Sequence, residues 1–126
     1  MSLLKNLIFS RPDEVYEEHE IRFFAAQLIL ALKFIHSHKI IYRDLKLENI
    51  VMNDDGFIQL IDFGLSKNVL NDNDRAFTYC GTLEYMAPEI YACFPYTYSV
   101  DYWALGIVLF EMAYSMRPFT GEYILL

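Results

Sequence analysis

A short hairpin signal with polar residues at both of its ends constrains this chain more than any other feature. Two mostly apolar runs, residues 50–53 and residues 57–61, flank the sequence Asp54-Asp55-Gly56. An Asp-Gly step between apolar runs favours a tight turn joining two antiparallel strands. The segment before the first strand and the segment after the second strand therefore meet at one end of the hairpin.

Side chains with oxygen atoms lie in both of those segments. Asp44 and Asn49 precede the first strand, Asp62 follows the second, and Lys46 stands between the first two. Oxygen ligands beside a lysine suit a hard divalent cation and a phosphate, and a hydroxyl that is to be phosphorylated needs a carboxylate near it to take its proton. Any one of these residues alone would be an ordinary polar loop residue, but four in register favour a phosphate-handling site.

Helical periodicity accounts for much of the remaining chain. Residues 17–36 are expected to form a helix that is apolar nearly all round in its middle and is therefore buried deep in a core. Residues 99–115 form a second apolar helix with Ser99 as its N-cap. We expect Phe23 and Trp103 to pack in the core. One face of the second helix is predicted to carry Val100, Trp103, Ala104, Ile107, Val108 and Glu111.

The shorter elements complete a fold that is mostly α with a short β-hairpin. Residues 40–41 are expected to form a short buried strand, and residues 85–93 to hold a short helix. The polar stretch 66–77 is expected to be a mobile surface loop. We find no internal repeat, low-complexity tract or interdomain linker.

Composition and charge exclude several classes of function. The net charge of −7 argues against a nucleic acid or an anionic membrane as partner, and it is compatible with a basic protein substrate. The longest apolar runs, residues 23–35 and 102–110, fall short of the ~20 residues of a membrane span. Cys80 and Cys93 form no zinc signature and are expected to be reduced thiols of a cytoplasmic or nuclear protein. The apolar content of 55% fits either a dense core or a piece of a larger one.

Three clusters follow one another along the chain: Tyr42-Arg43-Asp44-Leu45-Lys46-Leu47-Glu48-Asn49, then Asp62-Phe63-Gly64, then Ala87-Pro88-Glu89. Their order and spacing resemble the C-terminal lobe of a eukaryotic protein kinase, from about Leu4 to Phe119. Lys46, two residues after Asp44, follows the serine/threonine-kinase pattern. Residues 77–89 resemble the AGC group, near its protein kinase B and ribosomal S6-kinase branches. The resemblance implies an α+β fold.

The resemblance also implies roles for particular residues, with ATP and Mg²⁺ as cofactors. Asp44 would be the catalytic base, and Lys46 would steady the transferred phosphoryl group. Asn49 and Asp62 would hold Mg²⁺ that bridges the ATP phosphates. Val51 would form the apolar floor under adenine.

Regulation and substrate choice follow from the same resemblance. Thr78, phosphorylated by an upstream activating kinase, would supply the anion that joins the cations Arg43 and Lys67. Thr82 would bond to the catalytic loop and shape the pocket for the residue that follows the target hydroxyl. Glu48 would receive an arginine that precedes the target Ser or Thr of a protein substrate.

The sequence shows no match to the glycine-rich loop, the strand lysine or the helix glutamate of an N-terminal kinase lobe. We therefore expect residues 1–126 to be a partial, incomplete kinase domain, from about the hinge and helix D region to just after helix F. Such a domain, when complete, would transfer the ATP γ-phosphate to Ser or Thr. Alone, the chain is expected to be inactive, to expose apolar faces and to aggregate. The alternative is a catalytically inactive binding or scaffold module, or a truncated gene product.

Overall fold

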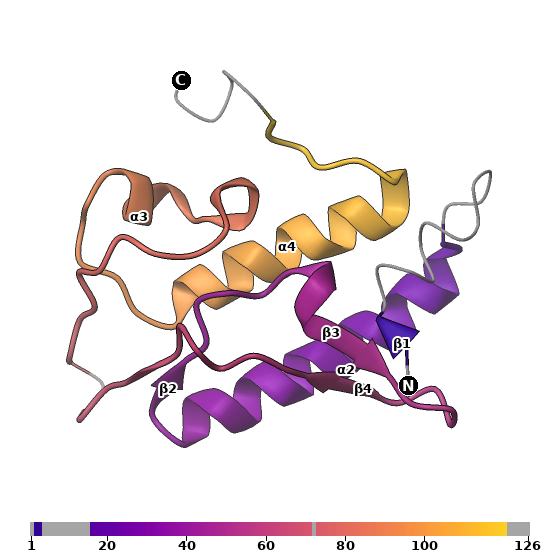
Figure 1. Ribbon diagram of the computed structural model, residues 1–126, viewed down its shortest axis with the longest axis horizontal. Coiled ribbons are helices and arrows are strands. Elements are labelled where there is room, and N and C mark those ends of the chain that lie inside the picture. The colour runs from indigo at the N-terminus through magenta and orange to yellow at the C-terminus, as the bar shows by residue number, and fades with distance from the viewer. Residues whose placement is uncertain (1, 4–15, 72, 121–126) are drawn as a thin grey trace.

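Two long helices form the body of the molecule (Figure 1). The computed structural model describes the backbone of β1 (Ser2–Leu3), residues 16–71 and residues 73–120. Helices α2 (Glu18–Ser37) and α4 (Ser99–Tyr114) lie side by side and antiparallel. The backbone N–H of Tyr16 donates to the carbonyl of Met112 at one end, and His36 contacts Asp101 at the other. Both helices lie within one or two residues of the predicted ranges.

Helix α2 begins with a cluster of acidic side chains. The Glu20 carboxylate accepts the backbone N–H of Glu17 at 3.0 Å, which satisfies one of the donors that a helix start leaves without a partner. Arg22 pairs with Glu18 one turn earlier at 2.5 Å. Acidic groups in the first turn also interact favourably with the positive end of the helix dipole. These contacts stabilise the start of the helix at Glu18.

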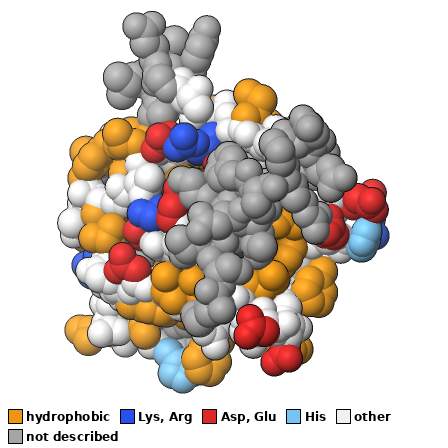
Figure 2. Space-filling model, turned by 45° about the vertical axis from the view of Figure 1, so that its right-hand side comes forward, with side chains coloured by type: hydrophobic (Ala, Val, Ile, Leu, Met, Phe, Trp, Pro, Cys, Tyr) orange, Lys and Arg blue, Asp and Glu red, His pale blue; other side chains and the backbone are white. Residues whose placement is uncertain are grey.

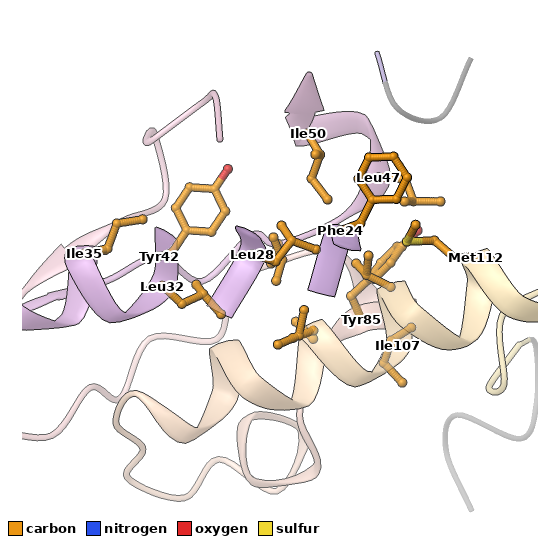
Figure 3. Packing of buried hydrophobic residues seen from close by; sticks show 14 of the residues in the cluster. Phe24, Leu28, Leu32, Ile35, Tyr42, Leu47, Ile50, Tyr85, Ile107 and Met112 are labelled. Carbon is orange, nitrogen blue, oxygen red and sulfur yellow. The ribbon is translucent and has the colours of Figure 1, made fainter. Parts of the chain in front are cut away.

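The main core lies between α2 and α4 (Figure 3). Leu28 and Leu32 of α2 and Val108 of α4 are fully buried there. Burial of a large aliphatic side chain contributes about 1.5–3 kcal/mol, so these residues hold the two helices together. The other residues that Figure 3 labels in this core are Phe24, Ile35, Tyr42, Leu47, Ile50, Tyr85, Ile107 and Met112.

The predicted hairpin is present and belongs to a three-stranded antiparallel sheet. Strand β3 (Ile50–Met52) pairs with β4 (Ile58–Leu60), and β1 lies on the other side of β3. Gly56 has a φ of +85°, as the turn requires. The Gln27 side chain ties the hairpin to α2, because it accepts the N–H of Ile58 at 3.0 Å and donates to the carbonyl of Gly56 at 3.4 Å.

Parts of the polar stretch 66–77 pair with other segments of the chain. Strand β5 (Lys67–Asn68) pairs antiparallel with β2 (Ile40–Ile41). Ala76 forms an isolated antiparallel bridge with Tyr96. These pairings use backbone groups alone, so a polar sequence without alternation can make them. The prediction of a surface loop over the whole stretch was wrong at Lys67–Asn68 and at Ala76.

Three predictions about side-chain placement were also wrong. Ser99 does not cap α4: it is the first helical residue, and its hydroxyl donates to Glu89 at 3.2 Å. Helix α2 is buried on one face only, and Phe23 is 51% exposed on the other. Trp103 is 36% exposed and stacks on Phe119 rather than packing in the core.

Exposed apolar side chains occur on several elements, as expected for this chain. Leu30 and Phe34 share the outer face of α2 with Phe23, and Figure 2 shows hydrophobic side chains interspersed with acidic ones on one side of the molecule.

The short helix α3 (Pro88–Tyr91) lies within the range predicted for it. Both cysteines are free thiols. No helix in the described part of the chain is long and apolar enough to cross a membrane.

Candidate active site

The carboxylate of Asp101 fixes the loop that carries the first polar cluster. Asp101 is 1% exposed at the start of α4. One of its oxygens accepts the backbone N–H of Tyr42 at 2.9 Å and the other accepts that of Arg43 at 2.8 Å. Arg43 has a φ of +70°, a strained backbone conformation for a residue other than glycine. The buried carboxylate thus holds the loop in a shape that it would not adopt by itself.

Four of the predicted residues meet in one closed cluster. The Asp44 carboxylate, 7% exposed, accepts the Thr82 hydroxyl at 2.8 Å and pairs with the Lys46 ammonium at 2.9 Å. Lys46 also donates to the Thr82 hydroxyl at 2.8 Å. The Asn49 amide group donates to the carboxylate and to the carbonyl of Asp44, both at 2.9 Å. The arrangement orients a carboxylate beside a cation, with each side chain held by at least one other.

Gly81 allows the segment that carries Thr82 to come this close to the loop. Its φ is +117°, and a Cβ atom added there would lie 3.0 Å from the carbonyl oxygen of Arg43. Only glycine tolerates both the dihedral angle and the close approach. The Gly81-Thr82 step therefore has two local functions, because the first residue makes room and the second supplies the hydroxyl.

Asp62 follows the second strand, at the same open end of the hairpin as Asn49, and lies close to the loop but outside the cluster. The backbone N–H of Ile61 donates to the carbonyl of Asn49 at 3.0 Å, which joins the two hairpin ends. The Asp62 carboxylate accepts the N–H of Gly64 at 3.1 Å, and the residue has a φ of +60°. Asp62 is exposed, so its carboxylate is accessible to a ligand.

Tyr42 and Phe63 connect the two parts of the site. Their rings meet edge to face with centroids 5.0 Å apart, and the Tyr42 hydroxyl donates to the carbonyl of Ile61. Burial, and then the nearby charges of Asp44 and Asp62, raise the pKa of Tyr42. The hydroxyl therefore stays protonated and keeps its hydrogen bond at neutral pH.

The available ligands fit a magnesium ion that shares its coordination with a phosphate. Both N–H groups of the Asn49 amide donate to Asp44, which leaves the amide oxygen for a cation. The exposed Asp62 carboxylate offers a second oxygen that could bind a cation. Within the described residues no group of three or more His, Cys, Asp or Glu side chains could hold a metal ion alone. Mg²⁺ commonly binds through one or two protein oxygens together with water and substrate phosphates.

The predicted regulatory residues lie near one another without a direct contact between their side chains. Arg43 donates to the hydroxyl of Tyr96 at 3.1 Å, and that hydroxyl donates to the carbonyl of Thr78 at 2.7 Å. Thr78 is exposed. Lys67, in β5, lines a surface depression that also includes Phe77, the residue before Thr78. The Tyr96 hydroxyl therefore connects the Arg43 side chain to the backbone of Thr78. Lys67 lies apart from this connection, on β5.

An acidic region surrounds the hydroxyl of Tyr85. This hydroxyl donates to the carboxylate of Glu111, which is 5% exposed. Burial, then the hydrogen bond and charge of Glu111 and the charge of Glu48, raise the pKa of Tyr85, and Arg117 opposes them. Arg117 itself pairs with Glu84 at 2.7 Å. The region therefore combines the predicted substrate carboxylate Glu48 with a second, buried carboxylate from α4.

Several residues that support the site could not be assigned to it from the sequence. The sequence predicts only a helix face for Glu111 and no role for Tyr96. No ligand spacing marks His36 in the sequence, but its ring contacts the Asp101 carboxylate at 2.7 Å. These residues act across 18 to 65 positions of the chain, and no local motif marks them. Val51 lies in the middle of the sheet and is 6% exposed, in a position compatible with an apolar floor.

Comparison with known proteins supports the same reading of the motifs. The family model described as "Protein kinase domain" matches residues 2–124. The match includes the loop 42–49, the hairpin and the Asp62-Phe63-Gly64 cluster.

Individual relatives are serine/threonine kinases of several kinds. The chain is 44% identical over 109 residues to Serine/threonine-protein kinase N2 of Danio rerio, a match that covers 86% of this chain and 11% of the relative. It is 45% identical over 117 residues to Ribosomal protein S6 kinase alpha-2 of Homo sapiens, covering 91% and 16%. It is 45% identical over 107 residues to Protein kinase C delta type of Homo sapiens, covering 85% and 16%. The chain thus spans less than one sixth of the length of these curated relatives.

Proposed function

Because the chain belongs to the protein kinase domain family, we propose that it supplies the catalytic residues of an ATP-dependent serine/threonine protein kinase. The activity is transfer of the ATP γ-phosphate to the hydroxyl of a Ser or Thr in a protein substrate. The observation that carries this proposal is the closed cluster of Asp44, Lys46, Asn49 and Thr82, with contacts of 2.8–2.9 Å. Within this family, the chain would correspond to part of the C-terminal lobe of the kinase domain.

Each member of the cluster has a distinct role in this reaction. The Asp44 carboxylate accepts the proton of the substrate hydroxyl and directs its oxygen toward the phosphate. The Lys46 ammonium, 2.9 Å from that carboxylate, neutralises negative charge that develops on the transferred phosphoryl group. The Thr82 hydroxyl joins the two and keeps their spacing fixed. Most of the rate enhancement in phosphoryl transfer comes from such positioning and electrostatic stabilisation.

Asn49 and Asp62 are the residues that would hold Mg²⁺, which neutralises charge on the ATP phosphates when bound. Asn49 is 5% exposed and is fixed by Asp44, so its amide oxygen has a defined direction. Asp62 is positioned through the Gly64 N–H and through the backbone contact between Ile61 and Asn49. Val51, buried on the same hairpin, provides an apolar surface for the adenine ring.

The acidic region around Tyr85 favours a basic substrate. Glu48 and Glu111 place two carboxylates close to one hydroxyl, and the chain carries a net charge of −7. An arginine that precedes the target Ser or Thr would match two carboxylates through charge-assisted hydrogen bonds. Thr82, beside Asp44, would contact the residue that follows the target.

Thr78 is the proposed site at which an upstream kinase activates the enzyme. A phosphate there would lie near Arg43, whose position the Tyr96 hydroxyl links to the Thr78 carbonyl. Lys67 on β5 is the second proposed cation. A phosphate between two cations orders a loop through charge-assisted hydrogen bonds. If Thr78→Ala left the activity of the full-length protein unchanged, this regulatory role would be wrong.

The test of the enzymatic proposal is phosphate transfer from radiolabelled ATP to a basic Ser/Thr peptide by the full-length protein. Asp44→Asn should reduce the rate by about 100-fold or more, because the isosteric amide cannot accept the proton. Asp55→Asn makes the same chemical change in an exposed turn and should leave the rate within twofold. Equal rates for wild type and Asp44→Asn would contradict the proposal and favour a binding or scaffold role. The 126 residues alone should show negligible transfer.

A further inference from the structure

Tyr96 links three separate parts of the chain around Thr78. Its ring is buried, with 3% of the residue exposed. Its backbone exchanges two hydrogen bonds with Ala76, at 2.9 and 3.0 Å, and it lies just before α4. The backbone of Tyr96 therefore already attaches the segment that carries Thr78 to the body of the molecule.

The hydroxyl of Tyr96 adds a second, more specific link. It donates its single proton to the carbonyl of Thr78 at 2.7 Å and accepts a proton from the Arg43 guanidinium at 3.1 Å. The Cys80 sulfur lies 3.9 Å from the same oxygen. Because the hydroxyl proton is already donated to Thr78, the thiol is the donor in that contact. Burial raises the pKa of Tyr96, against the opposing effect of Arg43, so the hydroxyl keeps its proton at neutral pH.

Arg43 is held from several directions in this arrangement. Its Nε donates to the carbonyl of Leu65 at 2.6 Å, and its backbone N–H donates to Asp101 at 2.8 Å. A guanidinium carries five N–H donors. Two of them are used by Leu65 and Tyr96, and within the described residues three remain for an anion. The guanidinium is thus fixed beside Thr78 and still able to bind a phosphate.

We propose that the Tyr96 hydroxyl is a positioning group that holds Thr78 beside Arg43 before Thr78 is phosphorylated. The inference rests on the proposed function, in which Thr78 is the activation site. The neutral hydroxyl bridges the Thr78 carbonyl and the Arg43 guanidinium. It therefore orders part of this segment before a phosphate is present to do so. A phosphate on Thr78 would bind the remaining N–H groups of Arg43 directly and make the bridge less important.

This role predicts an effect that depends on the phosphorylation state. Tyr96→Phe keeps the buried ring and the backbone bridge to Ala76 but removes the hydroxyl. In the unphosphorylated protein the segment around Thr78 should open more often, and basal phosphate transfer should fall. With Thr78 phosphorylated, the same substitution should have a much smaller effect, because charge-assisted bonds are stronger than the neutral bridge.

Tyr98→Phe provides a matched control two residues away. The Tyr98 hydroxyl is buried and has no hydrogen-bond partner among the described residues, so this substitution removes a hydroxyl without removing a hydrogen bond. Tyr98 packs on the His36 ring, and phenylalanine preserves that contact. Any general cost of replacing a buried tyrosine near the start of α4 should appear in both variants.

The first measurement is hydrogen–deuterium exchange of the full-length protein, which requires no catalysis. Relative to Tyr98→Phe, Tyr96→Phe should raise exchange in residues 76–81 by about five- to tenfold in the unphosphorylated form, the effect expected for one lost hydrogen bond. After phosphorylation of Thr78 the ratio should fall below about twofold. Equal exchange in the two unphosphorylated variants would overturn the inference. Equilibrium unfolding in urea shows whether Tyr96→Phe is folded.

If Tyr96→Phe is not folded, Arg43→Lys tests the same bridge, because lysine keeps the charge but cannot hold both Leu65 and Tyr96. It should loosen residues 76–81 in the unphosphorylated form as well, and unchanged exchange there would again overturn the inference.

The second measurement is phosphate transfer by the same variants, with and without phosphate on Thr78. Tyr96→Phe should lower the unphosphorylated rate about fivefold relative to Tyr98→Phe, and the phosphorylated rates should agree within twofold. If the wild type shows no transfer, the proposed enzymatic function fails, and the exchange result still decides the positioning role. If the wild type is active and Tyr96→Phe matches Tyr98→Phe in both assays, only the inference about Tyr96 fails.

Discussion

The ring of His36 lies 2.7 Å from the carboxylate of Asp101, although 65 positions separate the two residues. The contact joins the last turn of α2 to the first turn of α4. The same carboxylate accepts the backbone N–H groups of Tyr42 and Arg43. The loop that carries Asp44 is therefore fixed through one buried acid on which both long helices converge.

Substitution of Asp101 should destabilise the protein and disorder this loop. Tyr42 and Arg43 each donate to a different oxygen of Asp101. Asp101→Asn replaces one of these oxygens with an NH2 group, which cannot accept a hydrogen bond, so one N–H group loses its acceptor and the left-handed conformation of Arg43 loses support. We expect a loss of about 2–4 kcal/mol in the free energy of unfolding. Urea unfolding followed by circular dichroism measures it, with Asp55→Asn in the exposed turn as the control. A loss below 0.5 kcal/mol, on the order of a surface change, would show that the loop is held in another way.

Gly81 should tolerate no side chain. Gly81→Ala places a Cβ 3.0 Å from the Arg43 carbonyl at a φ of +117°, and we expect a cost of about 1–3 kcal/mol. Gly106→Ala is the matched control, because Gly106 lies in α4 with nothing within 4 Å of the added Cβ. That variant should be stabilised by about 0.5–1 kcal/mol. Thermal or urea unfolding compares the two, and equal effects would contradict the close approach at Gly81.

The Thr82 hydroxyl should matter for the rate more than for substrate affinity. Thr82→Val keeps the shape of the side chain but removes the group that bridges Asp44 and Lys46. We expect kcat to fall about 10- to 100-fold, because the base and the cation lose their fixed spacing. Thr82→Ser keeps the hydroxyl and should retain most of the activity. Steady-state kinetics of the full-length protein separates kcat from KM; a change confined to KM would assign Thr82 to substrate binding alone.

The buried tyrosine hydroxyls should make the fold sensitive to alkaline conditions. The pKa of Tyr85 is raised from the ordinary value of 10.0, first by burial and then by Glu111. Above pH 10 the unfolded chain therefore releases a proton that the folded chain retains, and the free energy of unfolding should fall by about 1.4 kcal/mol per pH unit for this group. Below pH 9 it should be constant with respect to this group. Tyr85→Phe should reduce the slope above pH 10 in urea unfolding, and an unchanged slope would exclude this linkage.

Local patterns in the sequence predicted the elements, and they failed where contacts are distant or depend on backbone pairing. The hairpin followed from the Asp-Gly turn, and both long helices followed from apolar spacing. The bridge between Ala76 and Tyr96 pairs backbone groups in segments without alternation, so no pattern marked it. Phe23 and Trp103 are apolar and were expected in the core, but hydrophobicity alone does not say which face of a helix finds a partner.

The candidate site divides in the same way. The motifs around Asp44, Lys46, Asn49 and Thr82 led to residues that the structure brings into contact, while their chemical roles stay predictions. His36, Tyr96 and Glu111 could not be found, because each acts on a residue far away in the sequence.

The Gln27 side chain that ties the hairpin to α2 also bears on the order in which the chain assembles. Its two bonds span 29 and 31 positions, whereas those of Asp101 to the loop span 58 and 59. A nascent chain could therefore form the helix–hairpin unit before Asp101 has been synthesised, since shorter closures are entropically cheaper. The hairpin ends that present Asn49 and Asp62 would then precede the bent loop of Asp44. Pulse-labelling exchange during refolding would detect protection of the hairpin amides before those of Tyr42 and Arg43.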